Sequence, residues 1–179
     1  MRKLDGKVAV ITGASKGIGA SIAEHLAAEG ASVVVNYATS QAGADAVAGR
    51  IVAKGGKAIA IRADVSEPGD IGRLFKQTRD SYGKLDILVN NAGVFQFAPL
   101  DAVTPEHIRR QFDLNVIGLL LTTQAAVRLI GPEGVRSSTS VPSLARCRRR
   151  MRRHTVRRKR QWMRLRFRYL RNSALGKFA

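Results

Sequence analysis

Short apolar runs recur along the first 134 residues, separated by longer stretches in which apolar residues return every three or four positions. Each run is dense in Val, Ile, Leu and Ala, as strands buried on both faces of a parallel sheet are. The pattern therefore predicts four buried strands, at Lys7–Thr12, Ser32–Asn36, Lys57–Arg62 and Leu85–Asn90.

The stretches between and after these runs predict helices. The helical spacing of apolar residues and the turn signals place them over Ile18–Ala28, Gln41–Lys54, Ser66–Tyr82 and Thr104–Leu129. Ser66 is the expected cap of the third helix, and the fourth has a possible break. Strands that alternate with helices predict an α/β fold, a doubly wound parallel sheet of right-handed βαβ units. The pattern stops after the fourth strand and the long helix.

The charge of the chain changes abruptly near Gly134. Residues 1–134 carry 15 Lys and Arg against 13 Asp and Glu, whereas residues 135–179 carry 16 Lys and Arg and no acid. The second segment shows neither period, and Arg146–Arg171 is dense in Arg with scattered aromatic residues. We therefore expect one folded domain over 1–134 and an irregular basic tail over 135–179.

Composition also excludes several kinds of protein. The single Cys147 excludes a disulfide framework and a Cys-rich zinc site, and no metal spacing joins His25 to His107. We expect no metal. No apolar run approaches the ~18 residues of a membrane span, and no export signal is found, so we expect a cytoplasmic protein with no membrane partner.

A glycine-rich turn, Thr12–Gly19, joins the first strand to the first helix. A dinucleotide pyrophosphate needs bare backbone N–H groups at the start of a helix, where a side chain would block its approach. Glycines meet that need, although a plain strand-to-helix turn is the simpler alternative. The predicted cofactor-binding residues of this turn are Gly13, Ser15, Lys16, Gly17, Ile18 and Gly19.

Two further motifs follow in order, Asp64-Val65 after the third strand and Asn90-Asn91-Ala92-Gly93 after the fourth. With the glycine turn they resemble the short-chain dehydrogenase/reductase family over about residues 3–134, and in particular its 3-oxoacyl-(acyl-carrier-protein) reductase and glucose-dehydrogenase-like members. The resemblance implies a Rossmann-like fold that binds NAD or NADP. It also implies hydride transfer between the cofactor and a carbonyl or alcohol substrate, such as a 3-oxoacyl thioester.

By this resemblance, Asp64 and Val65 lie beside the adenine, and Asn91, Ala92 and Gly93 line the cofactor and brace the sheet. Asn115 matches the catalytic-helix asparagine that helps to hold a proton-relay water and the active-site lysine. Taken alone, Asp64 could simply cap the turn before Ser66, and Asn115 could be an ordinary solvated helix residue. These alternatives stay open at the level of the sequence.

The choice of cofactor can be argued from charge. An NAD site usually places an acid after the second strand to bind the ribose 2′-hydroxyl. Here that position reads Asn36-Tyr37, with no carboxylate to repel a 2′-phosphate, and Lys16 adds a positive charge on the same side. Both features favour NADP over NAD, although Lys16 could be only a solvated loop residue.

The proton-transfer residues of the family are missing. The reaction needs a serine, a tyrosine and a lysine four residues after that tyrosine, which lowers the tyrosine pKa from about 10. The residues four positions after the three tyrosines are Gln41, Asp86 and Ser173. We therefore expect an oxidoreductase by family whose present chain is inactive. Full-length relatives are usually homo-oligomers, but their interfaces need regions that are missing here.

Residues 135–179 can also be tested for a shifted reading frame. In that frame the third base of each codon is joined to the first two bases of the next codon, and the genetic code limits which residues each new codon can encode. In that frame Gly134 through Leu144 permits G-S-I-I-N-I-S-S-V-A, which resembles the family's fifth strand with its serine. From the His154/Thr155 junction the chain permits Y-S-A-T-K, which supplies the tyrosine and the lysine. We interpret residues 135–179 as a frame-shifted segment that lacks the fifth strand and is unstructured.

The alternative is a non-catalytic basic polypeptide that binds nucleic acid through residues 135–179. Dense Arg contacts phosphates, and interleaved aromatic side chains stack on bases. Even a frame-shifted tail would bind polyanions nonspecifically through its charge.

Overall fold

One parallel sheet organises the computed structural model, which describes residues 2–130 and 136–139. Its strand order within those residues is β3-β2-β1-β4-β5, so the chain moves outward from β1 first to one side and then to the other. The strands are β1 (Val8–Ile11), β2 (Ser32–Tyr37), β3 (Lys57–Arg62), β4 (Ile87–Asn90) and β5 (Arg136–Thr139). The reversal beside β1 is a topological switch point, where open α/β sheets bind their ligands.

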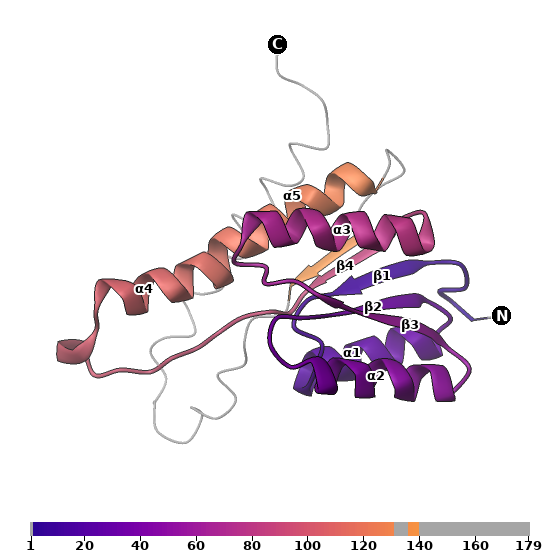
Figure 1. The fold of residues 1–179 in the computed structure, drawn as a ribbon, viewed down its shortest axis with the longest axis horizontal. Coiled ribbons are helices and arrows are strands. Elements are labelled where there is room, and N and C mark those ends of the chain that lie inside the picture. The colour runs from indigo at the N-terminus through magenta and orange to yellow at the C-terminus, as the bar shows by residue number, and fades with distance from the viewer. Residues whose placement is uncertain (1, 131–135, 140–179) are drawn as a thin grey trace, which may run out of the picture. The chain divides into compact units, whose positions relative to one another are not determined.

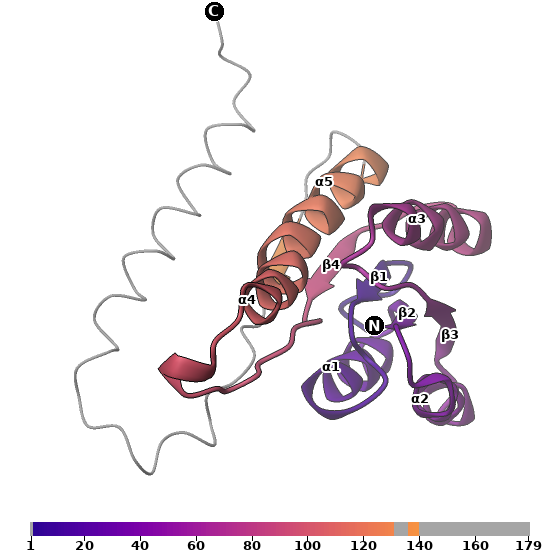
Figure 2. The ribbon, with the colours of Figure 1, turned by 60° about the vertical axis from the view of Figure 1, so that its left-hand side comes forward.

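Helices cover both faces of the sheet (Figure 1). One face carries α1 (Gly17–Ala28) and α2 (Gln41–Ala53), and the other carries α3 (Pro68–Tyr82) and α5 (Leu119–Leu129). A short 3-10 helix, η1 (Leu100–Ala102), precedes α4 (Pro105–Phe112), which continues through the π-helix η2 (Asp113–Gly118) into α5 (Figures 1 and 2). The doubly wound, Rossmann-like fold predicted from the sequence is confirmed.

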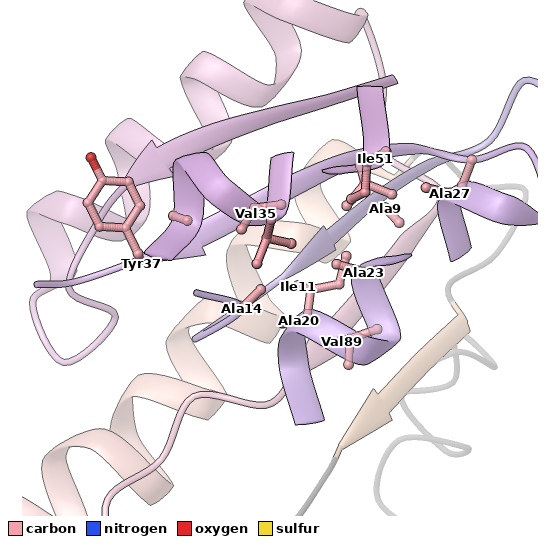
Figure 3. Close-up of a cluster of buried hydrophobic side chains, with 14 residues drawn as sticks. Ala9, Ile11, Ala14, Ala20, Ala23, Ala27, Val35, Tyr37, Ile51 and Val89 are labelled. Carbon is pink, nitrogen blue, oxygen red and sulfur yellow. The ribbon is translucent and has the colours of Figure 1, made fainter. Parts of the chain in front are cut away.

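The two faces of the sheet bury separate apolar clusters because neighbouring side chains of a strand point in opposite directions. Ala9 and Ile11 of β1 pack with α1 and α2, whereas Val8 and Val10 pack with α3 and α5. Figure 3 shows the first cluster, with Tyr37 at its far end from Ala27 and Ile51. The predicted apolar strands are therefore the core between two helical layers.

The helices differ most from the predicted ones at the start of α3 and within the long helix. The N-cap of α3 is Glu67, not Ser66, and Pro68 is the first residue of the helix. Ser66 instead donates to Asp64 in the preceding turn. The possible break in the long helix corresponds to η2, where the backbone opens to the wider π-helical turn without ending the helix.

A fifth strand corrects the prediction that the sheet ends at the fourth. Within the tail assigned to 135–179, Arg136–Thr139 pairs in parallel with Ile87–Asn90 of β4. The hydrogen bonds between two paired strands join backbone N–H and C=O groups and need no apolar side chains. A polar segment that follows α5 can therefore pair with the open edge of β4. The interpretation of 135–179 as a segment without a fifth strand was therefore wrong at Arg136–Thr139, and residues 140–179 lie outside the described part of the chain.

Candidate functional site

The carboxyl ends of the central strands border an open pocket of about 730 Å³. Most of the residues predicted from the sequence line it: Gly13, Ser15, Lys16, Asn36, Asp64, Val65, Asn91, Ala92 and Gly93. Gly17, Ile18, Gly19 and Asn115 are not in its lining. The fold therefore brings three separate motifs, of which the first and the last lie more than 70 positions apart in sequence, to one cavity.

The glycine-rich turn needs glycine for two different reasons. At Gly13 the backbone is left-handed, with φ of 62°, and an added Cβ would lie 2.9 Å from the Cα atom of Ala92. Gly17 is also left-handed, with φ of 60°, but a Cβ there would meet nothing within 4 Å. Gly13 thus serves close packing between two motifs, whereas Gly17 leaves bare backbone beside open space where α1 begins.

Asn36 lines the pocket, but its amide group is engaged inside the protein. Its Oδ1 accepts from the Gly13 N–H at 3.2 Å, and its Nδ2 donates to the carbonyls of Ile61 and Ala63 at 3.3 and 3.0 Å. The residue is buried. Asn36 therefore fixes the glycine turn to β2 and β3. The residues that follow it, Tyr37–Ser40, also line the pocket.

Thr12 and Asn91 lock the first motif to the third. The Thr12 hydroxyl accepts from the backbone N–H groups of Asn91 and Ala92, both at 3.0 Å. The Asn91 amide donates to the carbonyls of Thr12 and Gly13, also at 3.0 Å. Sequence reasoning did not include Thr12 among the site residues, although its hydroxyl just before a glycine turn was the available signal.

Asp64 both lines the pocket and caps a turn. Its Oδ1 accepts from the Ser66 N–H at 2.9 Å and from the Ser66 hydroxyl at 2.6 Å, which is the capping role that the sequence left open. Its own N–H donates to the Asp70 carboxylate at 2.9 Å. These bonds fix the backbone of Asp64 and Val65 at the edge of the pocket.

Asn115 lies in η2 and is hydrogen-bonded to the backbone of the segment that follows the third motif. Its Oδ1 accepts from the Val94 N–H at 2.9 Å, and its Nδ2 donates to the Val94 carbonyl at 2.7 Å. The alternative of a solvated helix residue is therefore wrong. Val94 lines the pocket, so Asn115 shapes one wall of the cavity through its neighbour.

The pocket also contains charged and hydroxyl side chains that sequence reasoning missed. Thr39 and Ser40 precede α2, while α4 and the start of η2 contribute Glu106, Arg109, Arg110 and Asp113. The two groups come from elements distant in sequence, and no motif links them. Only the folding of the long helix beside the carboxyl end of β3 places them in one cavity.

Neither tyrosine in the described residues is followed four positions later by a lysine. Burial raises the pKa of Tyr82, which packs against the cluster between α3 and the sheet and does not line the pocket. Tyr37 is buried at the end of β2, and Gln41 stands four residues after it. Tyr169 lies outside the described residues. Among those residues no three His, Cys, Asp or Glu side chains gather as metal ligands would.

The sequence that forms this fold and this pocket matches a known family. A model of the short chain dehydrogenases matches residues 7–137. The chain belongs to the short-chain dehydrogenase family. Its members are oxidoreductases, and the resemblance drawn from the motifs is confirmed.

Relatives of known sequence agree with this assignment. An uncharacterized oxidoreductase of Methylorubrum extorquens is 59% identical over 134 residues, which are 75% of this chain and 54% of that protein. A 3-oxoacyl-[acyl-carrier-protein] reductase of Synechocystis is 44% identical over 130 residues, 73% of this chain and 53% of that protein. The chain spans about half the length of the curated relatives it matches.

Solved structures share the fold as well as the sequence. A short chain dehydrogenase of Burkholderia cenocepacia in complex with NADP has a TM-score of 0.73 and 43% identity, covering 76% of this chain and 56% of that one. A short-chain dehydrogenase/reductase of Serratia marcescens has a TM-score of 0.73 and 37% identity, covering 78% of this chain and 60% of the other. No helix within residues 2–130 and 136–139 is long and apolar enough to cross a membrane.

Proposed function

We propose that residues 1–134 bind NADP(H), and that the family reaction of this domain is hydride transfer between that cofactor and a carbonyl or alcohol carbon. The observation that carries the proposal is the position of the pocket at the carboxyl ends of the strands, beside the glycine turn that begins α1. Bare backbone at Gly17 borders open space, as close approach of a pyrophosphate requires.

Each part of the dinucleotide has a proposed partner in this pocket. The backbone of Ser15–Gly19 would hold the pyrophosphate, and Asp64 and Val65 would border the adenine. Asn91–Gly93 would line the middle of the cofactor, with Val94 and Asn115 at the reacting end. The cavity lining supports these assignments for Ser15, Lys16, Asp64, Val65 and Asn91–Val94, and hydrogen bonds fix the segments that carry them.

The surroundings of the α2 N-terminus favour NADP over NAD. Residues Tyr37–Ser40 contain no carboxylate, and Thr39 and Ser40 offer two hydroxyl groups. Lys16 lines the same pocket and supplies a positive charge. The Asn36 amide is hydrogen-bonded inside the protein, so we do not assign it as a ligand of the 2′-phosphate. A 2′-phosphate would therefore meet donors and no nearby acid from this segment.

A bound nicotinamide gives a hydride to the substrate carbon or takes one from it. The reaction also needs a protein group that gives a proton to the substrate oxygen or takes one from it. In the family this group is a tyrosine followed four residues later by a lysine, and none of the tyrosines here has that lysine. We propose that this chain holds the cofactor without turning over a substrate. For an intact relative of the same domain we propose a small carbonyl compound or a 3-oxoacyl thioester as substrate.

Fluorescence titration of the full chain with NADPH and NADH tests the proposed cofactor. We expect NADPH to bind more tightly, and tighter binding of NADH would contradict the preference. The variant Lys16→Ala should reduce the affinity for NADPH more than that for NADH, whereas Lys76→Ala, an exposed lysine on α3 away from the pocket, should change neither.

A nucleic-acid-binding tail is the second candidate, and the 16 Lys and Arg without any acid in residues 135–179 favour it. Binding of this kind weakens steeply with salt and does not depend on NADP. Titration of a labelled oligonucleotide at several salt concentrations, with and without NADPH, separates the two activities. Sequence-selective binding that persists at high salt would favour a dedicated nucleic-acid function over nonspecific attraction.

Location and assembly complete the proposal. We propose a cytoplasmic location for this protein. Full-length relatives are expected to be homo-oligomers, but the match to the family covers only residues 7–137, and we propose that this chain does not assemble in the same way. Light scattering on the purified chain should give a monomer, and a stable tetramer would contradict this.

A further inference from the structure

We infer that Gly43 is a positioning residue that sets the preference for a 2′-phosphate, an inference that rests on the proposed binding of NADP(H). Gly43 lies in the first turn of α2 and does not line the pocket. Sequence reasoning gave it no role. Gly43 matters because a side chain at this position would collide with neighbouring residues of the pocket wall.

A Cβ atom on Gly43 would lie 2.8 Å from the carbonyl oxygen of Ser15 and 2.7 Å from the hydroxyl oxygen of Ser40. The Ser40 side chain can rotate away, but the Ser15 carbonyl is backbone within the glycine-rich turn. The backbone of Gly43 is not left-handed, so space and not conformation requires glycine here. Only glycine lets α2 begin this close to the turn that precedes α1.

The close approach joins two segments of the pocket wall into one corner. Ser15 and Lys16 come from the glycine turn, and Thr39 and Ser40 come from the loop before α2. Ser40 is the N-cap residue of α2, yet its hydroxyl makes no capping hydrogen bond. A phosphate held by both segments needs their donors at a fixed separation, because a displacement of about 1 Å is enough to loosen a polar site.

The far end of α2 is tied to α1 independently of Gly43. Arg50 of α2 forms an ion pair with Glu24 of α1 at 2.8 Å, and Lys54 approaches the same carboxylate at 3.8 Å. An alanine at position 43 would therefore move the first turn of α2 away from Ser15 while the last turns stay attached. The expected result is a wider corner in a domain that remains folded.

Gly49 provides a matched control on the same helix. A Cβ at Gly49 would meet nothing within 4 Å, so Gly49→Ala makes the same chemical change without the contact. Both substitutions raise helix propensity by a similar amount. Any difference between the two variants therefore reports the approach of α2 to the glycine turn.

Isothermal titration of the full chain with adenosine 2′,5′-bisphosphate and with ADP tests the inference. We expect Gly43→Ala to lower the ratio of the two affinities by roughly tenfold, the loss of about one charge-assisted hydrogen bond. Binding of ADP should change by less than about threefold, and Gly49→Ala should behave as the wild type. Thermal unfolding of each variant checks that the domain is intact.

Three results would overturn or redirect the inference. An unchanged affinity ratio in Gly43→Ala, or an equal loss for both ligands, means that Gly43 has only a packing role. If the wild type binds neither ligand, the proposed function itself fails. Should Gly43→Ala not fold, Ser40→Ala removes the hydroxyl held in the corner, and an unchanged ratio in that variant also overturns the inference.

Discussion

Thr12 and Asn91 stand 79 positions apart and hold each other by two hydrogen bonds of 3.0 Å. The Thr12 hydroxyl accepts from the Asn91 N–H, and the Asn91 amide donates to the Thr12 carbonyl. This exchange fixes the end of β1 to the end of β4 across the switch point of the sheet. The cavity proposed for the dinucleotide depends on it, because both motifs line that cavity.

Replacing Thr12 should therefore weaken both the fold and the pocket. Thr12→Val keeps the shape but leaves the N–H groups of Asn91 and Ala92 without their acceptor. We expect the free energy of unfolding to fall by about 2 kcal/mol, the cost of removing one acceptor from two partly buried N–H groups. Thr12→Ser keeps the hydroxyl and should lose less than about 1 kcal/mol. Urea unfolding of the two variants measures the difference, and equal losses would contradict the proposed role.

Substitution of Gly118 should destabilise the domain, because this glycine lies close to the backbone of Val65. A Cβ there would overlap the carbonyl oxygen of Val65, so the π-helix η2 and the end of β3 pack backbone against backbone. We expect Gly118→Ala to destabilise the domain by about 2 kcal/mol through overpacking. Gly72→Ala on α3, where a Cβ meets nothing within 4 Å, should instead gain up to about 1 kcal/mol. A thermal melt in which both variants match the wild type would refute the close packing.

Asp86 should make stability depend on acid pH. Partial burial opposes its ionisation, but hydrogen bonds from the Val8 N–H, Lys7 and Lys84 outweigh that effect and lower its pKa. A lowered pKa in the folded state gives stability that is present above the unfolded pKa of about 3.9 and is lost as the pH falls through the folded value.

Asp86→Asn tests this dependence directly. We expect the variant to be less stable than the wild type by about 1 kcal/mol at pH 7, and this difference to shrink as the pH falls below about 4 toward the lowered folded pKa. Glu106→Gln is the control, since Glu106 is exposed and its ion pair with Arg109 is long, at 3.7 Å. Urea midpoints measured from pH 7 to pH 3 decide the matter. A difference that persists undiminished in acid would rule out the charge of Asp86 as the cause.

Catalysis should be absent from the 179-residue chain and present after repair of the frame. A positioned acid–base group is typically worth ~10²–10⁴ in rate, and the chain lacks the tyrosine with its lysine. A gene re-encoded in the neighbouring frame from codon 134 should give NADPH-dependent reduction of a 3-oxoacyl thioester. Resequencing the natural gene is the companion measurement. Stop codons soon after codon 134 in that frame would defeat the frame-shift interpretation.

The sequence predicted the sheet well where side chains determine the structure. The first four strands and their helices follow from apolar periodicity, because β1, β2 and β4 are buried on both faces and β3 carries apolar residues toward both clusters. The fifth strand escaped prediction, since Arg136–Thr139 has no apolar run and pairs through its backbone with β4. A local pattern cannot show that α5 delivers this segment to an open edge.

The sequence predicted the motifs that form the candidate site, but not the hydrogen bonds and close contacts that hold these motifs in place. Glycine turns and strand ends located the pocket, whereas the inward amide of Asn36 depends on carbonyls of β3 and of the residue after it. The contact between Gly43 and Ser15 likewise joins a helix and a turn that no motif connects. Such relationships arise from the packing of distant segments, and one sequence carries no local signal for them.

Hydrogen exchange of the full chain with and without NADPH tests the central claim most directly, because it shows where the nucleotide binds. We predict slowed exchange at the glycine turn, at residues 37–40 and 64–65, and at Asn91–Val94, which together line the pocket. Protection confined to residues 135–179 would show that NADPH binds only as a polyanion to the basic tail. That result, or no protection at all, would contradict a dinucleotide site at the carboxyl ends of the strands.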